Sequence, residues 1–292
     1  MDSRRAALDR LHAAVAGRRA ALTYRLCVFL LLAVFSALIL FPPLWALSTS
    51  LKPEKEMLRY PPTILPTHWY LGNYRALFIA MPFARSLLNS FIVSSLSVCL
   101  TIFAGLMAAY VIARKEFVGK ELVFLLFLLC MMLPGLTNII PMFLLMGKLR
   151  LLNTYLALVL LYSAGNVAFS IWLLRGFIAS IPRELDEAAI LDGCSQFLIL
   201  QRIIFPLAVP GITATAILIF ISCWNEFIVA VTFTNKESMR TLTVAIYFFK
   251  TYWNVQWGSI MAASVLAVVP VLLFFAAMQR QLVSGLTRGA FR

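Results

Sequence analysis

The uncharged run SLLNSFIVSSLSVCLTIFAGLMAAYVIA, residues 86–113, indicates the fold class of this chain. A helix needs roughly 20 predominantly apolar residues to cross the hydrocarbon core of a bilayer, and this run is longer than that. A membrane-spanning β-barrel would instead show short strands of about 10 residues in which polar and apolar side chains alternate. The run therefore predicts a transmembrane helix.

Five further runs of this kind divide the rest of the chain. Its composition agrees with a membrane protein, because 62% of the residues are hydrophobic, only 13% are charged and the mean hydropathy is +0.91. The first run is longer than the apolar region of a signal peptide, about 7 to 15 residues, so we expect it to be retained. The sequence predicts an all-α integral membrane protein with six transmembrane helices, at 26–51, 86–113, 122–147, 151–174, 203–225 (continuing past Glu226 to 235) and 251–279.

The charge of the chain is strongly basic, with 25 Lys and Arg against 12 Asp and Glu and a net charge of +13. These basic residues are scattered over the connections, as the positive-inside rule describes, so we expect no nucleic-acid partner. Their bias favours a topology with both termini in the cytoplasm. The basic tail, residues 1–25, is compatible with a short helix on an anionic lipid surface and equally with a partly disordered segment.

Sequence signals for catalysis are absent. The chain has no phosphate-binding GxxxxGK[ST] loop, no paired catalytic carboxylates and no HExxH or GxSxG motif. Its five cysteines form no close pair and its two histidines fall on opposite sides of the membrane, so neither a disulfide framework nor a metal site is expected. We therefore expect a protein that is not an enzyme, and uphill transport would need an ion gradient or a separate ATPase.

Polar and helix-breaking residues inside the runs are few. Glu226 is the one acid well within an apolar run, and it is either part of an ion pathway or a hydrogen-bonded carboxylate that fixes helix packing near the outer face. Pro134, Gly135 and Pro141 interrupt the third run, where they either kink the helix for packing or allow it to move.

The stretch ELDEAAILDGCSQFLILQRIIFPLAVPG, residues 184–211, contains four acids in its first nine positions. Ser180 can cap a short helix that Gly193 would end, with the acids near the positive end of its dipole. Small residues share one face of this helix with an acid, which suits docking to a basic, concave partner; the face comprises Leu185, Ala188, Ala189 and Asp192. The alternative is an ordinary amphipathic connection whose acids balance Arg183 and Arg202. Ser195 can cap the next helix, which leads to Pro206 and Pro210.

This stretch resembles the EAA loop of permease subunits of bacterial ABC importers. The resemblance rests on Glu-Ala-Ala at 187–189, Asp192 and Gly193, and the spacing from there to Ile203, Pro206 and Pro210. Cys194 departs from the alanine that is common in the family, and the tail has no counterpart. Further stretches resemble the smaller permease of the maltose type: LSTSLKP (47–53), NYRALF (73–78), LLNS (87–90), AAYVIAR (108–114), CWNEF (223–227) and QRQLVSGLTRGAF (279–291).

The resemblance implies one permease domain, residues 26–292, with a coupling loop at about 180–206 between the fourth and fifth spans. It implies a location in the bacterial inner membrane, surrounded by lipid, and a sugar or sugar-like solute as substrate. The expected partners are a homologous second permease in a heterodimer, two copies of an ATPase subunit and an external solute-binding protein. The ATPase would bind ATP and Mg, whereas this chain would bind no cofactor.

Roles for individual residues follow from the same resemblance. Contact with the ATPase is expected through Glu187, Ala188, Ala189, Asp192, Gly193 and Pro206. The C-terminal tail of the family reaches the ATPase interface, which implicates Ser284, Gly285, Leu286 and Thr287. The residues expected to line or gate the substrate path are Asn138, Asn166, Asn225 and Glu226.

Two other functional classes compete with this interpretation. An ion-coupled secondary transporter of a small polar solute would show several charges within the membrane and an internal repeat of broken helices, and the sequence has one such acid and no convincing repeat. A membrane-embedded enzyme would need clustered acids or histidines at a membrane face. The acidic stretch lacks the spacing of a metal site.

Overall fold

The structure is a computed structural model that describes residues 2–80, 82–133, 135–249 and 255–289, with the backbone alone described for 2–23, 80 and 280–289. Every regular element in these residues is helical, which confirms the predicted class. In chain order they are α1 (Asp2–Ser50), α2 (Glu54–Met57), α3 (Gly72–Ala80), α4 (Phe83–Arg114), α5 (Lys120–Met132), η1 (Gly135–Asn138), α6 (Ile139–Lys148), α7 (Tyr155–Ala179), α8 (Glu184–Leu191), α9 (Gln196–Ile199), η2 (Leu200–Ile204), α10 (Phe205–Trp224), α11 (Ile228–Phe233), η3 (Glu237–Met239), α12 (Leu242–Phe248) and α13 (Trp257–Gly289).

Five helices in the described part of the chain are long and apolar enough to cross a membrane. The third predicted span, 122–147, is not one straight helix, because α5 and the η1–α6 segment meet at 91°. Leu133 ends α5 with an extended backbone, φ −70° and ψ 125°. A proline at the next position disfavours the helical conformation of the residue before it, which explains why the helix stops there.

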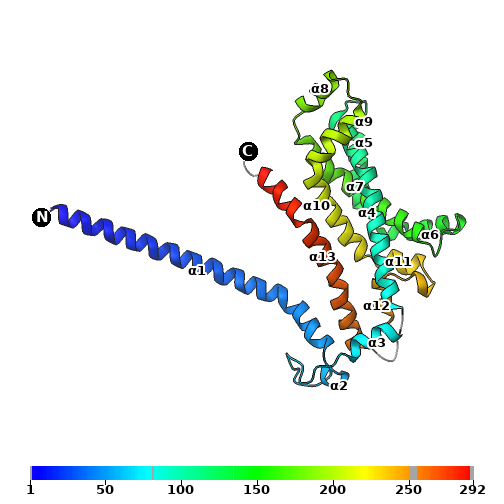
Figure 1. The fold of residues 1–292 in the computed structure, drawn as a ribbon, viewed down its shortest axis with the longest axis horizontal. Helices are drawn as coiled ribbons and strands as arrows, with labels where there is room; N and C mark the ends of the chain where they lie inside the picture. Colours follow the sequence, from blue (N-terminus) through cyan, green and yellow to red (C-terminus); the bar gives the residue numbers. More distant parts are fainter. Residues whose placement is uncertain (1, 81, 134, 250–254, 290–292) are drawn as a thin grey trace.

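The centre of the bundle is formed by α4 and α7, with α10 packed against both (Figure 1). Small side chains allow the close approach of α4 and α7: a Cβ at Gly105 would lie 2.0 Å from Ser170 Oγ. Ser163 Oγ donates to Ser97 O at 3.2 Å, and Ser170 Oγ donates to Thr101 O at 3.4 Å. Small and hydroxylated residues are the usual means of packing helices within a membrane.

Helix α1 meets α13 at its C-terminal end, and the rest of it projects away from the bundle (Figure 1). None of the most apolar part of Tyr24–Ser50 is buried, and for the corresponding part of α13 the buried share is only 11%, against about half for α4. Long apolar surfaces of α1 and α13 are therefore open to lipid or to another subunit.

The connection between α1 and α3 is tied together by hydrogen bonds. The Asn73 amide donates to the carbonyls of Ser50 (2.8 Å) and Lys52 (2.9 Å). The hydroxyls of Ser50 and Tyr74 are 2.8 Å apart. The stretches LSTSLKP and NYRALF thus meet at the end of the bundle opposite α8 (Figure 1).

Candidate functional site

Helix α8 begins later than the sequence predicts. Arg183 is its N-cap residue and has no capping side-chain bond. The prediction that Ser180 caps it is wrong, because α7 continues to Ala179 and Ser180 Oγ donates back to Phe177 O at 2.8 Å. The first turn does contain the three predicted acids Glu184, Asp186 and Glu187, whose negative charges interact favourably with the positive end of the helix dipole.

The end of α8 is a Schellman turn centred on Gly193. The Gly193 N–H donates to Ile190 O at 3.0 Å, and the Cys194 N–H donates to Ala189 O at 2.9 Å. Gly193 has φ +80°, the left-handed conformation that such a turn requires. Asp192 is the C-cap residue through its backbone. Gly193 therefore ends the helix as predicted.

The face of α8 that the sequence assigns to docking is divided between two sides of the helix. Ala189 is only 6% exposed and packs into a core cluster with residues of α4 and α7, whereas Ala188 and Asp192 are exposed. The inward position of Ala189 corrects the expectation that its side chain meets a partner. The outward surface combines acids with apolar side chains, namely Glu184, Leu185, Glu187, Ile190, Leu191 and Asp192.

Asp186 also faces inward, toward a residue that the sequence did not implicate. Its Oδ2 lies 2.7 Å from Nε of Arg114, the last residue of α4. The alternative in which the acids balance Arg183 and Arg202 is wrong for Arg183, since the acid that lies 3.8 Å from Arg183 is Glu116 and not an acid of α8. Within the part of the chain that the structure describes, Glu184 and Glu187 form no ion pair, and both are exposed.

The segment after Gly193 connects α8 directly to the membrane bundle. Ser195 caps α9 as predicted, because its Oγ accepts a bond from the Leu198 N–H at 3.4 Å. The chain then runs without interruption through α9, η2 and α10, from Gln196 to Trp224. In η2, a π-helical turn, the Phe205 N–H reaches back to Leu200 O. This wider turn immediately precedes the exposed Pro206, which has no N–H to offer to the helix.

Glu226 lies at a helix break rather than inside a continuous span. Helix α10 ends at Trp224, and the Glu226 carboxylate caps α11 by accepting from the N–H groups of Val229 (2.8 Å) and Ala230 (3.0 Å). Tyr162 Oη donates to the same carboxylate at 3.0 Å. Three donors satisfy this side chain, which matches the structural role among the two alternatives.

The other polar residues predicted for the substrate path are only partly brought together. The Asn166 amide donates to Tyr162 O at 2.8 Å and to Cys223 Sγ at 3.7 Å, three residues before Glu226. Asn225 is the exposed C-cap residue of α10. Asn138 is exposed at the end of η1, and within the described residues no hydrogen bond joins its side chain to Asn166, Asn225 or Glu226. The substrate path stays a prediction.

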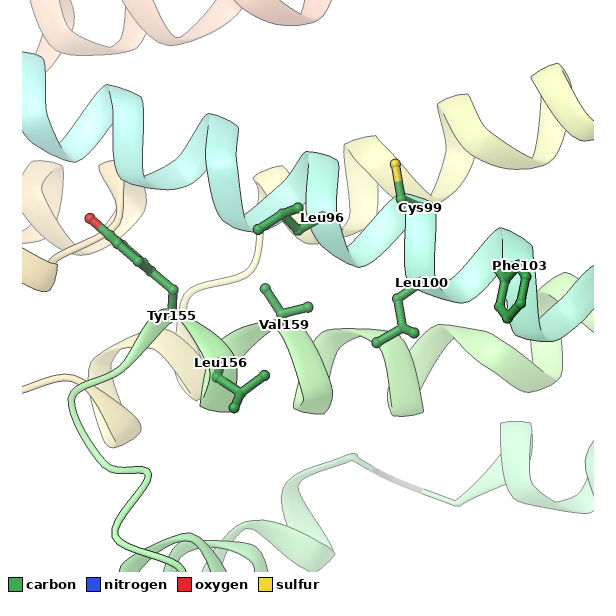
Figure 2. A pocket seen from close by; sticks show the side chains of 7 residues that line it. All are labelled: Leu96, Cys99, Leu100, Phe103, Tyr155, Leu156 and Val159. Atoms are coloured by element: carbon green, nitrogen blue, oxygen red, sulfur yellow. The ribbon is translucent and has the colours of Figure 1, made fainter.

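Two of the hollows on the described part of the molecule differ in character. The larger, about 610 Å³, is a groove lined by apolar side chains on the facing surfaces of α4 and α7 (Figure 2). The hydroxyl of Tyr155, which lines this groove, already donates a hydrogen bond to Asn89 Oδ1 at 2.7 Å. A sugar site requires several converging polar groups, so the groove does not fit one. A smaller hollow of about 230 Å³, near α2 and α3, is both aromatic and polar, with Glu54, Tyr70, Asn73, Gln256 and Trp257 among its lining residues.

The remaining predictions concern metal binding and the C-terminal tail. No group of three His, Cys, Asp or Glu side chains that could hold a metal ion occurs in the described residues. The backbone of Ser284, Gly285, Leu286 and Thr287 belongs to α13, but their side chains lie outside the described residues, so their role stays a prediction.

Comparisons with known proteins agree with one another. Residues 101–288 match the family described as "Binding-protein-dependent transport system inner membrane component". The sulfoquinovosyl glycerol transport system permease protein SmoH of Agrobacterium fabrum is 37% identical over 253 residues, 87% of this chain and 89% of SmoH. The trehalose/maltose transport system permease protein MalG of Thermococcus litoralis is 35% identical over 264 residues, 89% of this chain and 94% of MalG.

The fold comparison extends the similarity to solved structures. A chain of a bacterial ABC transporter involved in the import of alginate superposes with a TM-score of 0.77 at 22% identity, over 88% of this chain and 95% of that chain. The helical arrangement is therefore shared even where the sequences have diverged. Because the family match covers most of the bundle and both relatives align over nearly their whole length, the chain belongs to the inner membrane permease components of binding-protein-dependent transport systems.

Proposed function

We propose that this chain imports a sugar or sugar-like solute as one of two homologous permeases, with energy from a separate ATPase. SmoH and MalG are named for carbohydrate substrates that share many hydroxyl groups on ring scaffolds. The aromatic and amide side chains of this chain suit such ligands, through stacking and hydrogen bonds. Asn166, Asn225 and Asn138 are the amides that we assign to the substrate path, with Glu226 holding the local backbone.

The observation that carries the proposal is the construction of α8. Its outward surface is acidic and apolar, its inward surface is anchored, and its end is fixed by the turn at Gly193. An acidic and apolar surface that is held in place on its inward side suits a basic cleft of an ATPase subunit. In this assignment Glu187 and Asp192 supply charge, Ala188 allows close approach, Ala189 supports the surface from the core, and Pro206 lies at the start of the helix that leads from this loop into the membrane.

The partners follow from the surfaces that the isolated chain leaves open. The apolar sides of α1 and α13 suit a second permease and lipid. We assign α8 and both termini to the cytoplasm, where two ATPase copies would dock and bind ATP with Mg. The opposite end, with the aromatic and polar hollow beside Tyr70 and Trp257, would face an external solute-binding protein.

Reconstitution tests the proposal directly. The chain is purified with a second permease and an ATPase encoded beside it, placed in proteoliposomes and supplied with the external binding protein and radiolabelled sugars. We expect uptake that requires both ATP and the binding protein, and no labelling of the isolated chain by a photoreactive ATP analogue. Uptake driven by a proton or sodium gradient without the ATPase would instead support a secondary transporter.

A further inference from the structure

The last turn of α4 holds α8 through a buried ion pair. Arg114 Nε lies 2.7 Å from Asp186 Oδ2, and the two side chains are only 5% and 12% exposed. Arg114 Nη2 also donates to Ile181 O at 2.9 Å, just before α8 begins. One guanidinium thus binds both the helix and the segment that leads into it.

The same turn of α4 contacts both flanks of α8. Arg183 Nη2 donates to Ala113 O at 3.4 Å on the side that precedes the helix. Tyr110 Oη donates to Gln196 Oε1 at 2.9 Å on the side that follows it. Between these bonds, Ala109 and Ala189 belong to one core cluster. The 180–196 segment is therefore attached to α4 at its beginning, middle and end.

The Arg114–Asp186 pair is a close charge contact and not a well-aligned hydrogen bond, because within the described residues neither Arg114 Nε nor Asp186 Oδ1 has a hydrogen-bond partner. Removing two charges from water costs about as much as their attraction returns, so an apolar pair of similar volume can be equally stable. Loss of one partner, however, leaves a buried charge without compensation, so separating Arg114 from Asp186 is costly. The charge contact therefore holds α8 to α4, and the hydrogen bonds from Arg114 Nη2 to Ile181 O and from Tyr110 Oη to Gln196 orient the segment.

The far end of α4 is anchored as well. Asn89 donates to the carbonyls of Ser238 (3.0 Å) and Arg240 (2.9 Å), and Ser90 Oγ accepts from the Leu242 N–H at 2.7 Å. With 32 residues, α4 extends about 48 Å at 1.5 Å per residue. It forms a continuous rod between α8 and the segment that leads into α12.

We propose that Arg114 and Asp186 are positioning residues that couple α8 to α4, so that displacement of α8 moves α4 directly and reaches the 238–242 segment at the other end of the bundle. This path is separate from the connection through Gly193 and α10. The proposal rests on the proposed function, because it requires an ATPase that displaces α8.

The test compares three variants in the complete, reconstituted transporter. Asp186→Asn keeps the shape of the side chain and removes its charge. Glu121→Gln makes the same chemical change in an exposed pair, where Glu121 is 77% exposed and 3.8 Å from Arg175. The double variant Arg114→Met/Asp186→Leu replaces the pair by apolar side chains and serves as the folding control, since no buried charge is left alone.

The measured quantity is sugar taken up per ATP hydrolysed. We expect Asp186→Asn and the double variant to co-purify with the ATPase but to lose about tenfold in this ratio, a typical size for a coupling between two sites, because neither variant keeps the charge contact between α8 and α4, while Glu121→Gln stays near the wild-type value. A wild-type ratio in the double variant or in Asp186→Asn would overturn the coupling role of the pair. If the wild-type chain itself did not co-purify with an ATPase, the proposed function would fail instead.

Discussion

Replacement of Gly193 tests the turn at the end of α8 most sharply. Its φ of +80° is a conformation that a residue with a Cβ adopts at a cost of about 1–2 kcal/mol. A Cβ built at Gly193 meets no atom within 4 Å, so this cost arises from the backbone alone and not from a clash. Gly193→Ala should therefore pay about that amount, and the β-branched Gly193→Val at least as much.

This free energy acts on the turn rather than on the whole fold. A cost of about 1–2 kcal/mol changes the ratio of the native turn to alternative turns by roughly 5- to 30-fold. The membrane helices do not depend on this exposed turn, so the variant should insert normally and hold the ATPase poorly. Asn tolerates the left-handed conformation best among residues with a Cβ, so Gly193→Asn should retain more function than Gly193→Val.

A matched control exists elsewhere in the chain. Gly119, in the connection between α4 and α5, has φ +84° and also no atom within 4 Å of an added Cβ. Gly119→Val should suffer the same backbone strain in a turn that is not part of α8. The assay is co-purification of the ATPase together with uptake in vesicles. Equal losses in Gly193→Val and Gly193→Asn, or wild-type behaviour of Gly193→Val, would refute the role of the backbone conformation.

Three further predictions concern acids of different environments. Glu187→Lys reverses an exposed charge on α8 and should reduce ATPase co-purification, because binding is weakened by several kcal/mol if the contact is desolvated. The control Lys120→Ala loses only its pair with Glu116 and should have little effect. Equal retention of the ATPase in both variants would contradict docking at α8. Glu226→Gln keeps the shape of the side chain but cannot accept from both capped N–H groups of α11 as a carboxylate does. Thermal unfolding should therefore show a loss of stability of about 1–2 kcal/mol, while ATP-driven uptake and its pH profile persist. Collapse of uptake with intact ATP hydrolysis would indicate ion coupling. The Thr67 N–H, followed by the hydroxyls of Thr67 and Thr63 and the charge of Lys52, lowers the pKa of Glu56. The bonds from Thr63 and Thr67 to Glu56 attach the segment 58–71, so this stabilisation should be fully present above the usual pKa of Glu and be lost as the pH falls through the lowered pKa. Limited proteolysis of the segment should increase in acid for the wild type and much less for Glu56→Gln. Proteolysis of the wild type that does not depend on pH would exclude the mechanism.

The positions of most membrane helices were determined by local composition. A long apolar run satisfies its backbone within the helix and its side chains in lipid, so five of the six predicted spans appear as helices with shifted ends. The turns around α8 were also local: Gly193 and Ser195 act on backbone groups within a few residues. The EAA spacing identified the family for the same reason, because it is contained in one short stretch.

Other features depended on packing between distant segments. Tyr110 meets Gln196 across 86 residues of sequence, and Tyr162 meets Glu226 across 64. Composition alone could not show that Arg114 takes Asp186 as its partner, nor that Ala189 faces the core. Hydropathy likewise assigned 122–147 to one span, since a sum over side chains carries no direction. Pro134, Gly135 and Pro141 indicated an interruption there, but the 91° change between α5 and α6 became visible only in three dimensions. A sequence pattern reflects the interactions that a segment makes with itself and with lipid. Which residues pair, which side of a helix faces the core and where a helix bends depend on the neighbours that the folded bundle brings into contact.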